Sequence, residues 1–391
     1  EALADESGDP LMRATALCRR ARLALDQNRA AEIAPTLRRA LEAALAAGDR
    51  ALEIEALRLQ AVHLRGTGDF EGALAACDRA LDRAGLHGAH LAARGAILLQ
   101  RGIVLRRMGA LMEATRAYVE AVVVFRRLGI RRSESLALNA LGVALAAIGE
   151  TEDAVPTIRG SLAIDRETGE QMLLARKLSN VGQLYAELGD VSRALPFFER
   201  SQDVLSVIPD PEAEADLLCA MVEVLLEHGE TRPRLMKLLD RARSAVDTLR
   251  DPYHAARERL VRAQVERATG SIDVAIALAR EARRLAAAGS YGYGLQAAVF
   301  LAECLAEAGE IAEPKKIVEG VQQDVLDRDV ERAERVHASL ARTLRALGDR
   351  DGAARAQAIA TDIVHHRFEG IRDPALREHY RTLQNRMGIP L

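Results

Sequence analysis

The sequence predicts an all-α protein, a right-handed α-solenoid of about nine helix pairs that ends in a C-terminal capping helix. The first observation is a turn residue, nine times Gly and once Asn, that returns every 39 to 41 residues along the 391-residue chain, as in stacked repeat proteins. The second is apolar spacing of the helical kind on both sides of each turn. The third is a composition rich in the helix formers Ala, Leu, Arg and Glu, with 3% aromatic residues. The turn residues are Asn28, Gly68, Gly109, Gly149, Gly189, Gly229, Gly270, Gly309, Gly348 and Gly388.

The fourth unit shows how each repeat divides into two helices. Leu138 and Leu141 lie on one face of the segment before the turn, and Ala154 and Ile158 lie on one face of the segment after it. Both patterns are amphipathic helices rather than alternating strands. Gly149 ends the first helix, because Gly tolerates the left-handed conformation of a helix C-cap.

Small residues recur at fixed distances from the turn. Seven residues before it stand Ala21, Ala61, Gly102, Gly142, Gly182, Val222, Ala263, Ala302 and Ala341. We expect these positions to be close contacts between paired helices, where a bulky side chain would cost roughly 1–3 kcal/mol. Larger side chains such as Tyr118, Ile158 and Phe198 lie between the small ones along the second helices.

Several details of the register support the repeat boundaries. Asp-Pro pairs open helices, since Asp caps an N-terminus and Pro suits the first helical position; they are Asp9-Pro10, Asp210-Pro211, Asp251-Pro252 and Asp373-Pro374. In the sixth unit, one inserted residue at 231–233 shifts the pattern, and allowing for it brings Leu235, Leu239 and Ala242 back into register. In the eighth unit, Pro314 falls in the first turn of the second helix, where Pro is tolerated. The last segment, 373–388, is polar and is expected to be a solvated cap at the open end of the solenoid.

This pattern resembles the tetratricopeptide repeat, in a long variant of about 40 residues. The fifth unit matches most closely, at Gly182, Tyr185, Gly189, Ala194 and Phe198. HEAT and armadillo repeats share the longer period, but the tetratricopeptide residues fit better. Such long repeats are similar to those in sensor domains of bacterial STAND and maltose-regulator-like signalling proteins. The resemblance implies one superhelical domain over 1–391, with repeats at 10–48, 49–89, 90–130, 131–169, 170–209, 210–250, 251–289, 290–328 and 329–370 and a cap helix at 373–388.

The resemblance also implies a concave groove lined by the first helix of each pair, which would bind a protein or peptide partner. The candidate groove residues are Arg106, Arg107, Asn139, Arg176, Ser179, Asn180, Gln183, Glu187, Asp216, Glu223, Arg257, Gln264 and Arg267. Further inward positions are Arg22, Arg58, Arg65, Glu227, Glu303, Glu307, Arg335, Arg342 and Arg345. The groove is then basic at both ends and acidic in its middle, a surface that could select a partner of complementary charge. An ordinary solvated face of mixed charge is the alternative. Asn180 is the sharpest single candidate for holding a peptide backbone.

Composition excludes several other classes of function. A formal net charge of −3 argues against nonspecific nucleic-acid binding. Cys18, Cys77, Cys219 and Cys304 form no CxxC pair and indicate small buried residues in a reducing compartment. A reactive thiol at Cys18, beside Arg residues, is the less favoured alternative. No apolar run of 18 residues exists, so nothing spans a membrane and a cytoplasmic location is expected. The paired histidines His87 and His90, and His365 and His366, are read as surface residues rather than metal ligands.

We therefore expect a protein- or peptide-binding module without catalytic residues, metal or cofactor. The leading hypothesis is the ligand-sensing or partner-binding region of a bacterial multidomain regulator. The chain does not start with Met, which favours an excised domain with further domains elsewhere in the same protein. The alternative is a stand-alone scaffold, adaptor or chaperone-like protein that brings two protein partners together.

Overall fold

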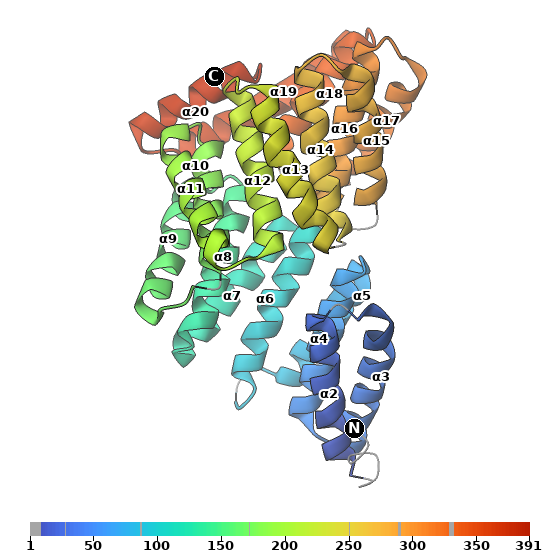
Figure 1. Ribbon diagram of the computed structural model, residues 1–391, viewed down its shortest axis with the longest axis vertical. Coiled ribbons are helices and arrows are strands. Elements are labelled where there is room, and N and C mark those ends of the chain that lie inside the picture. Colours follow the sequence, from blue (N-terminus) through green and yellow to red (C-terminus); the bar gives the residue numbers. More distant parts are fainter. Residues whose placement is uncertain are drawn as a thin grey trace. The chain divides into compact units, whose positions relative to one another are not determined.

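The computed structural model describes residues 9–27, 29–86, 88–171, 173–249, 251–287, 291–327 and 332–391. Within these ranges the regular structure is entirely helical, which confirms the all-α class (Figure 1). The nineteen helices are α2 (Pro10–Asp26), α3 (Ala30–Ala47), α4 (Arg50–Gly66), α5 (Phe70–Ala84), α6 (Leu91–Arg107), α7 (Leu111–Leu128), α8 (Arg131–Ala147), α9 (Thr151–Thr168), α10 (Leu174–Glu187), α11 (Val191–Val207), α12 (Pro211–Glu227), α13 (Arg232–Leu249), α14 (Pro252–Ala268), α15 (Ile272–Ala286), α16 (Tyr291–Glu307), α17 (Ala312–Asp327), α18 (Ala333–Ala346), α19 (Arg350–Gly370) and α20 (Pro374–Arg386).

The chain forms two compact units, and the division falls inside α8. Unit 1 is Glu1–Ala140 and unit 2 is Leu141–Leu391. In each unit, consecutive helices pack as pairs, α2 on α3 and α4 on α5 in unit 1, and α10 on α11 and α12 on α13 in unit 2. First helices of neighbouring pairs also contact one another, as α10 does α12 and α12 does α14. Sequential pairing of this kind is what the repeat period predicts.

The turn glycines have the backbone that the sequence predicts. All nine have a positive φ, from +74° at Gly229 to +93° at Gly149. In this left-handed region a Cβ would be strained, so Gly is the residue that ends the first helix of each pair. The tenth turn residue, Asn28, lies outside the described residues.

In several repeats the small residue before the turn faces a large residue sixteen positions later. A Cβ built on Gly102 would lie 2.4 Å from a ring carbon of Tyr118, and one on Gly182 would lie 2.5 Å from a ring carbon of Phe198. Where the small residue is Ala, as at Ala61, its partner is a smaller side chain, Cys77. The size of the second residue therefore decides whether the first can carry a Cβ.

Capping follows the Asp-Pro pairs. Each of the four Asp side chains accepts a hydrogen bond from a backbone N–H in the first turn of its helix, at Asp9, Asp210, Asp251 and Asp373. Such caps satisfy N–H groups that a helix cannot satisfy itself. In α13, which begins at Arg232, the residues brought into register by the insertion are fully buried.

Unit 2 closes on itself, which differs from the expected open, solvated end. The carbonyl of His379 in α20 approaches the turn glycine Gly189 so closely that a Cβ there would lie 2.4 Å from it. Tyr380 and Leu383 of α20 are buried, and Tyr380 shares an apolar cluster with Leu188 of the α10–α11 turn. The cap helix is thus amphipathic rather than polar on all sides, and its apolar side packs against the α10–α11 turn.

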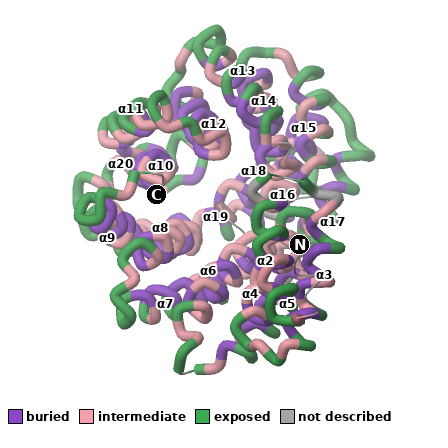
Figure 2. The backbone as a smooth tube through the Cα atoms, turned by 60° about the horizontal axis from the view of Figure 1, so that its bottom comes forward, coloured by how far each residue is buried: buried purple, intermediate pink, exposed green. Residues whose placement is uncertain are grey.

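The neighbouring helix α19 reinforces this closure. It contacts α9, and its Arg367 lies against Gly149 in the α8–α9 turn. Arg367 also forms an ion pair with Glu334 of α18, at 2.8 Å. In Figure 2, α20 lies beside α10, and α19 lies between the α18 and α9 sides of unit 2.

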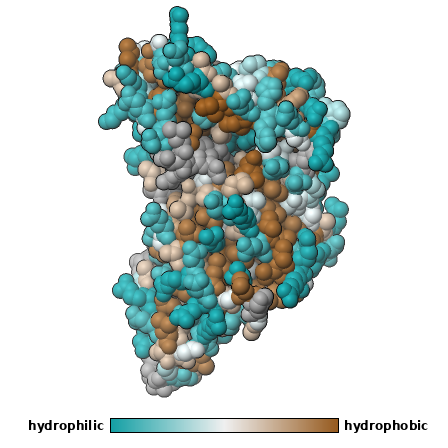
Figure 3. All heavy atoms as spheres, turned by 180° about the vertical axis from the view of Figure 1, so that it is seen from behind, coloured by the Kyte–Doolittle hydropathy of each residue, from teal (hydrophilic) through white to brown (hydrophobic). Residues whose placement is uncertain are grey.

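The surface of the described residues is mixed in character. Hydrophilic side chains cover much of the face in Figure 3, and hydrophobic ones lie in patches between them. None of the described helices is both long enough and apolar enough to cross a membrane.

Candidate functional site

Two adjoining cavities mark the candidate site, and both lie within unit 2. The larger has a volume of about 590 Å³ and the smaller about 330 Å³. They share Gln264, Arg267, Phe300 and Arg335, which stand on the first helices α14, α16 and α18. We call the two cavities together the unit 2 groove. The larger is lined by Gln264, Arg267, Gln296, Val299, Phe300, Glu303, Arg332, Arg335, Val336, Ala338, Ser339, Arg342, Arg386, Met387, Gly388 and Ile389. The smaller adds Glu223, Leu226, Glu227, Ala268 and Glu307.

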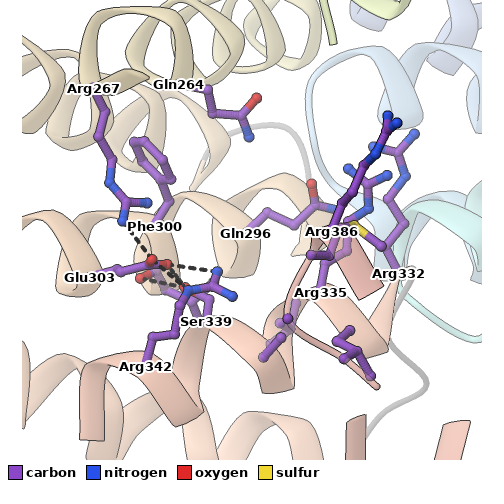
Figure 4. Close-up of a pocket in the computed structure, with 16 residues that line it drawn as sticks. Gln264, Arg267, Gln296, Phe300, Glu303, Arg332, Arg335, Ser339, Arg342 and Arg386 are labelled. Atoms are coloured by element: carbon purple, nitrogen blue, oxygen red, sulfur yellow. Dashed lines mark hydrogen bonds and ion pairs between the residues drawn. The ribbon is translucent and has the colours of Figure 1, made fainter. Parts of the chain in front are cut away.

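One end of the larger cavity is organised around Glu303. Its carboxylate accepts hydrogen bonds from Arg267 at 2.7 Å, from the Ser339 hydroxyl at 2.6 Å and from Arg342 at 2.7 Å (Figure 4). Burial would raise the pKa of Glu303, but the two guanidiniums outweigh it and lower the pKa. Glu303 is therefore ionised, and it fixes two Arg side chains at the cavity wall. Arg267 also lies over the Phe300 ring, 5.6 Å from its centroid.

The other end of the cavity is basic. Figure 4 shows Arg332, Arg335 and Arg386 gathered there, with Arg332 at the start of α18 and Arg386 at the end of α20. Gln296 reaches between the two ends from α16. Five of the sixteen lining residues are Arg and one is Glu, so the wall of the larger cavity carries more positive than negative side chains.

Two of these arginines also reach across to the first helices of earlier repeats. Arg332 contacts Glu187 of α10 at 3.2 Å and Glu223 of α12 at 3.5 Å. Arg335 contacts Glu227 of α12 at 3.0 Å. Burial would raise the pKa of Glu223, but the neighbouring guanidiniums, Arg332 first, lower it. The acidic middle and basic end that the sequence predicts are thus brought together as ion pairs inside unit 2.

A second group of predicted residues forms a buried charge cluster beside the groove. Arg257 of α14 donates to Asp216 of α12 at 2.8 Å. His254 lies 2.6 Å from the Asp251 carboxylate and 3.7 Å from that of Asp216. Burial would raise the pKa of Asp216, but His254 and Arg257 hold it below its usual range. These ion pairs hold α12 against α14.

The predicted residues of α10 are held by local partners. Arg176 contacts Asp210 at 2.9 Å and Glu212 at 3.1 Å. Ser179 is buried, and its hydroxyl accepts from Gln183 at 3.2 Å. Asn180 is partly buried and has interactions of its own, so its role toward a peptide stays a prediction.

The remaining predicted residues of the set lie in unit 1. Arg106 and Arg107 end α6, and both are partly buried. Asn139 stands in the part of α8 that belongs to unit 1. All three have interactions within the protein. Their place in a groove stays a prediction.

Sequence reasoning missed several residues that line the cavity. Gln296 lies thirteen residues before its turn glycine, the same register position as Arg257 and Arg335. The repeat register could therefore have identified Gln296 as a groove residue. Phe300 and Ser339 each lie nine residues before their turn, one position beyond those expected to face inward. Arg332 and Arg386 stand outside the helix interiors that the register describes.

Metal binding and a reactive thiol are the other site chemistries that the sequence raises. The described residues contain no cluster of three metal-ligating side chains, and His87 lies outside them. Cys18 is buried, and burial raises its pKa to about 11. A thiol that stays protonated at neutral pH is a poor nucleophile, which favours the small-hydrophobe interpretation over a reactive thiol.

Comparison with known proteins places the fold. No protein-family model matches the chain, and no curated protein matches it in sequence. A Rap protein complexed with Competence and Sporulation Factor is similar in structure, with a TM-score of 0.54 at 12% identity over 92% of this chain and 99% of that one. The Rap conjugation gene regulator of plasmid pLS20, in complex with the Phr* peptide, gives a TM-score of 0.56 at 12% identity over 89% and 98%.

A third solved structure is similar over nearly the whole of this chain. It is the STAND protein with a tetratricopeptide repeat sensor from Pyrococcus horikoshii, with a TM-score of 0.51 at 12% identity. The match covers 95% of this chain and 55% of that one. At these identities the likeness concerns the fold. The chain therefore has the fold of a tetratricopeptide-like repeat protein.

Proposed function

We propose that this chain is a protein- or peptide-binding module that acts as the ligand-sensing or partner-binding region of a signalling regulator. The ligand binds in the unit 2 groove. Two of the similar structures are Rap proteins in complex with Competence and Sporulation Factor and with the Phr* peptide, which supports a peptide as the ligand class. The identity is too low for the ligand itself to carry over.

The observation that carries this proposal is the composition of the groove wall. The amides of Gln264 and Gln296 can donate to and accept from a peptide backbone, and Phe300 offers an aromatic face. The volume of about 590 Å³ lies within the roughly 300–1,000 Å³ typical of small-ligand sites. An extended segment of a few residues matches a groove with polar groups along it and charged groups at its ends.

The test is selection of octapeptides from a random library against the full chain. Enriched peptides are then titrated by isothermal calorimetry and mapped by hydrogen exchange. We expect protection of α14, α16 and α18, and weaker binding to Phe300→Ala. The matched control is Ile359→Ala, an exposed apolar residue on α19, which should bind as the native protein does.

Two outcomes would contradict the proposal. One is that no peptide is enriched above background. The other is that protection falls on helices away from the groove and Phe300→Ala binds unchanged. A stable protein complex with its footprint outside the groove would support the adaptor hypothesis instead.

A further inference from the structure

Arg332 and Arg335 have two roles in unit 2. Both line the larger cavity, and both form the ion pairs with Glu187, Glu223 and Glu227 that tie α18 to α10 and α12. We call these ion pairs the cross-groove bridges. They join residues 108 to 145 positions apart in the sequence. A ligand that binds to these guanidiniums therefore meets carboxylates that already hold them.

The bridge between Arg335 and Glu227 is placed so that a ligand can exchange with it. The Arg335 and Glu227 side chains are 31% and 28% exposed, so water and solutes reach the pair. Partly exposed ion pairs are weak because solvent screens them. The pair is made by one hydrogen bond, from Arg335 to Glu227 at 3.0 Å, so a ligand carboxylate that binds the guanidinium at least as well can replace Glu227 at little cost.

Arg386 gives the cavity a positive charge that is not neutralised in this way. It is exposed, lines the larger cavity, and has no ion-pair partner among the described residues. Figure 4 places its side chain beside Arg332 and Arg335. A ligand with one carboxylate on Arg386 would neutralise a charge that the protein leaves uncompensated, and a second carboxylate could take the place of Glu227 on Arg335.

We propose that the ligand of the unit 2 groove is an acidic peptide whose carboxylates displace the cross-groove bridges. This inference rests on the proposed function and adds the ligand's charge and its effect. The peptide binds Arg386, Arg335 and Arg332 in place of the glutamates of α10 and α12. Glu227 turns to solvent, and Glu223 keeps its ion pair with Arg257. Binding then loosens α18 from the earlier repeats, while the apolar seat of α20 remains.

Competition gives the bridges and the ligand a reciprocal effect on each other. Any change that removes a bridging glutamate must tighten the ligand by the factor with which the ligand loosens that bridge. Removal of Arg386 weakens the ligand and leaves the bridges intact. The two effects have opposite signs, and a purely structural role for Glu227 does not predict tighter binding.

The experiment is a fluorescence-polarisation titration of the full chain with labelled hexa-aspartate, against hexa-asparagine and hexa-lysine. We expect hexa-aspartate to bind more tightly than both, with an affinity that falls as salt rises. Glu227→Gln should bind hexa-aspartate about fivefold more tightly, and Arg386→Gln about fivefold more weakly, as expected for one partly exposed charge pair. Matched controls are Glu319→Gln on α17 and Arg355→Gln on α19, two exposed residues outside the groove, which should change nothing.

The outcomes separate this inference from the function on which it rests. Equal binding of hexa-aspartate and hexa-asparagine, or unchanged binding by Glu227→Gln, would overturn the acidic-ligand proposal. If library peptides without acidic residues still bind with a footprint on α14, α16 and α18, the peptide-binding function stands and only the charge assignment fails. If neither the library nor hexa-aspartate yields binding, both fail.

Discussion

Gly142→Leu tests the close contact on which the helix pairing depends. Gly142 lies in α8, facing α9. A Cβ built there would lie 2.3 Å from Cγ1 of Ile158, 3.1 Å from its Cδ1 and 3.2 Å from the backbone oxygen of Ala154. Ile158 is branched at Cβ and has few other rotamers. The backbone oxygen cannot move without α9, so a larger side chain must push the two helices apart.

The magnitude follows from two opposing effects. Overpacking of a filled core costs about 1–3 kcal/mol, and contact with both a stiff side chain and a backbone atom favours the upper end. Leu is better than Gly in a helix by about 1 kcal/mol. We expect a net loss of about 2 kcal/mol in the free energy of unfolding. The control is Gly320→Leu in α17, where nothing lies within 4 Å of the added Cβ and the helix gain of about 1 kcal/mol should appear alone.

The assay is urea unfolding followed by circular dichroism, with hydrogen exchange of α8 and α9 as the local readout. The local readout is needed because long repeat arrays can lose two-state behaviour. In the Gly142→Leu background, Ile158→Ala should recover part of the loss, because it removes the atoms that clash. Equal shifts for Gly142→Leu and Gly320→Leu, or strictly additive effects with Ile158→Ala, would refute the reasoning.

Three further outcomes are expected. Gly189→Ala should lower the melting temperature more than Gly229→Ala, since both have positive φ but only Gly189 is pressed by the α20 backbone; equal losses would contradict the closure. Lys177→Met removes the ammonium from the buried Asp165 carboxylate and should cost about 3–5 kcal/mol in urea unfolding, most of it recovered by adding Asp165→Leu. Burial lowers the pKa of His254, but two aspartates outweigh it and raise the pKa to about 10, from the unperturbed 6.5. The stabilisation is therefore fully present below pH 6.5 and lost as pH rises toward 10, so the melting-temperature advantage over His254→Gln should narrow from pH 6 to pH 10.

What the sequence predicts well is local along the chain. A turn glycine such as Gly149 needs only its own backbone conformation, and the pairing of Gly182 with Phe198 spans sixteen residues within one repeat. Such contacts recur with the period, so a single register finds them all. The helix pairs and their caps follow from the same register.

The closure of unit 2 is not local, and the sequence does not predict it. The contact of Arg332 with Glu187 joins residues 145 positions apart. Their distance depends on small rotations between successive repeats, which accumulate over several pairs. The apolar stripe of Leu376, Tyr380 and Leu383 on α20 was visible as a pattern, but a linear array offers it nothing to cover. For the same reason, the sequence does not predict the basic end of the larger cavity, because Arg332 and Arg386 are brought together only by the positions of α18 and α20 (Figure 4).

The packing of α20 on the α10–α11 turn changes the order in which the repeats of unit 2 can unfold. In a linear stack, the terminal repeat has one neighbour and frays first, and loss then travels inward. Here the last helix is gripped by a repeat from the middle of the chain, at Gly189 and Leu188. The last helix of unit 2 therefore has packing partners both in the preceding repeat and in a repeat from the middle of the chain. The final repeats of unit 2 should exchange amide hydrogens as slowly as its central repeats. If the contact of α20 with the α10–α11 turn is broken, the array should lose cooperativity and its terminal repeats should unfold first.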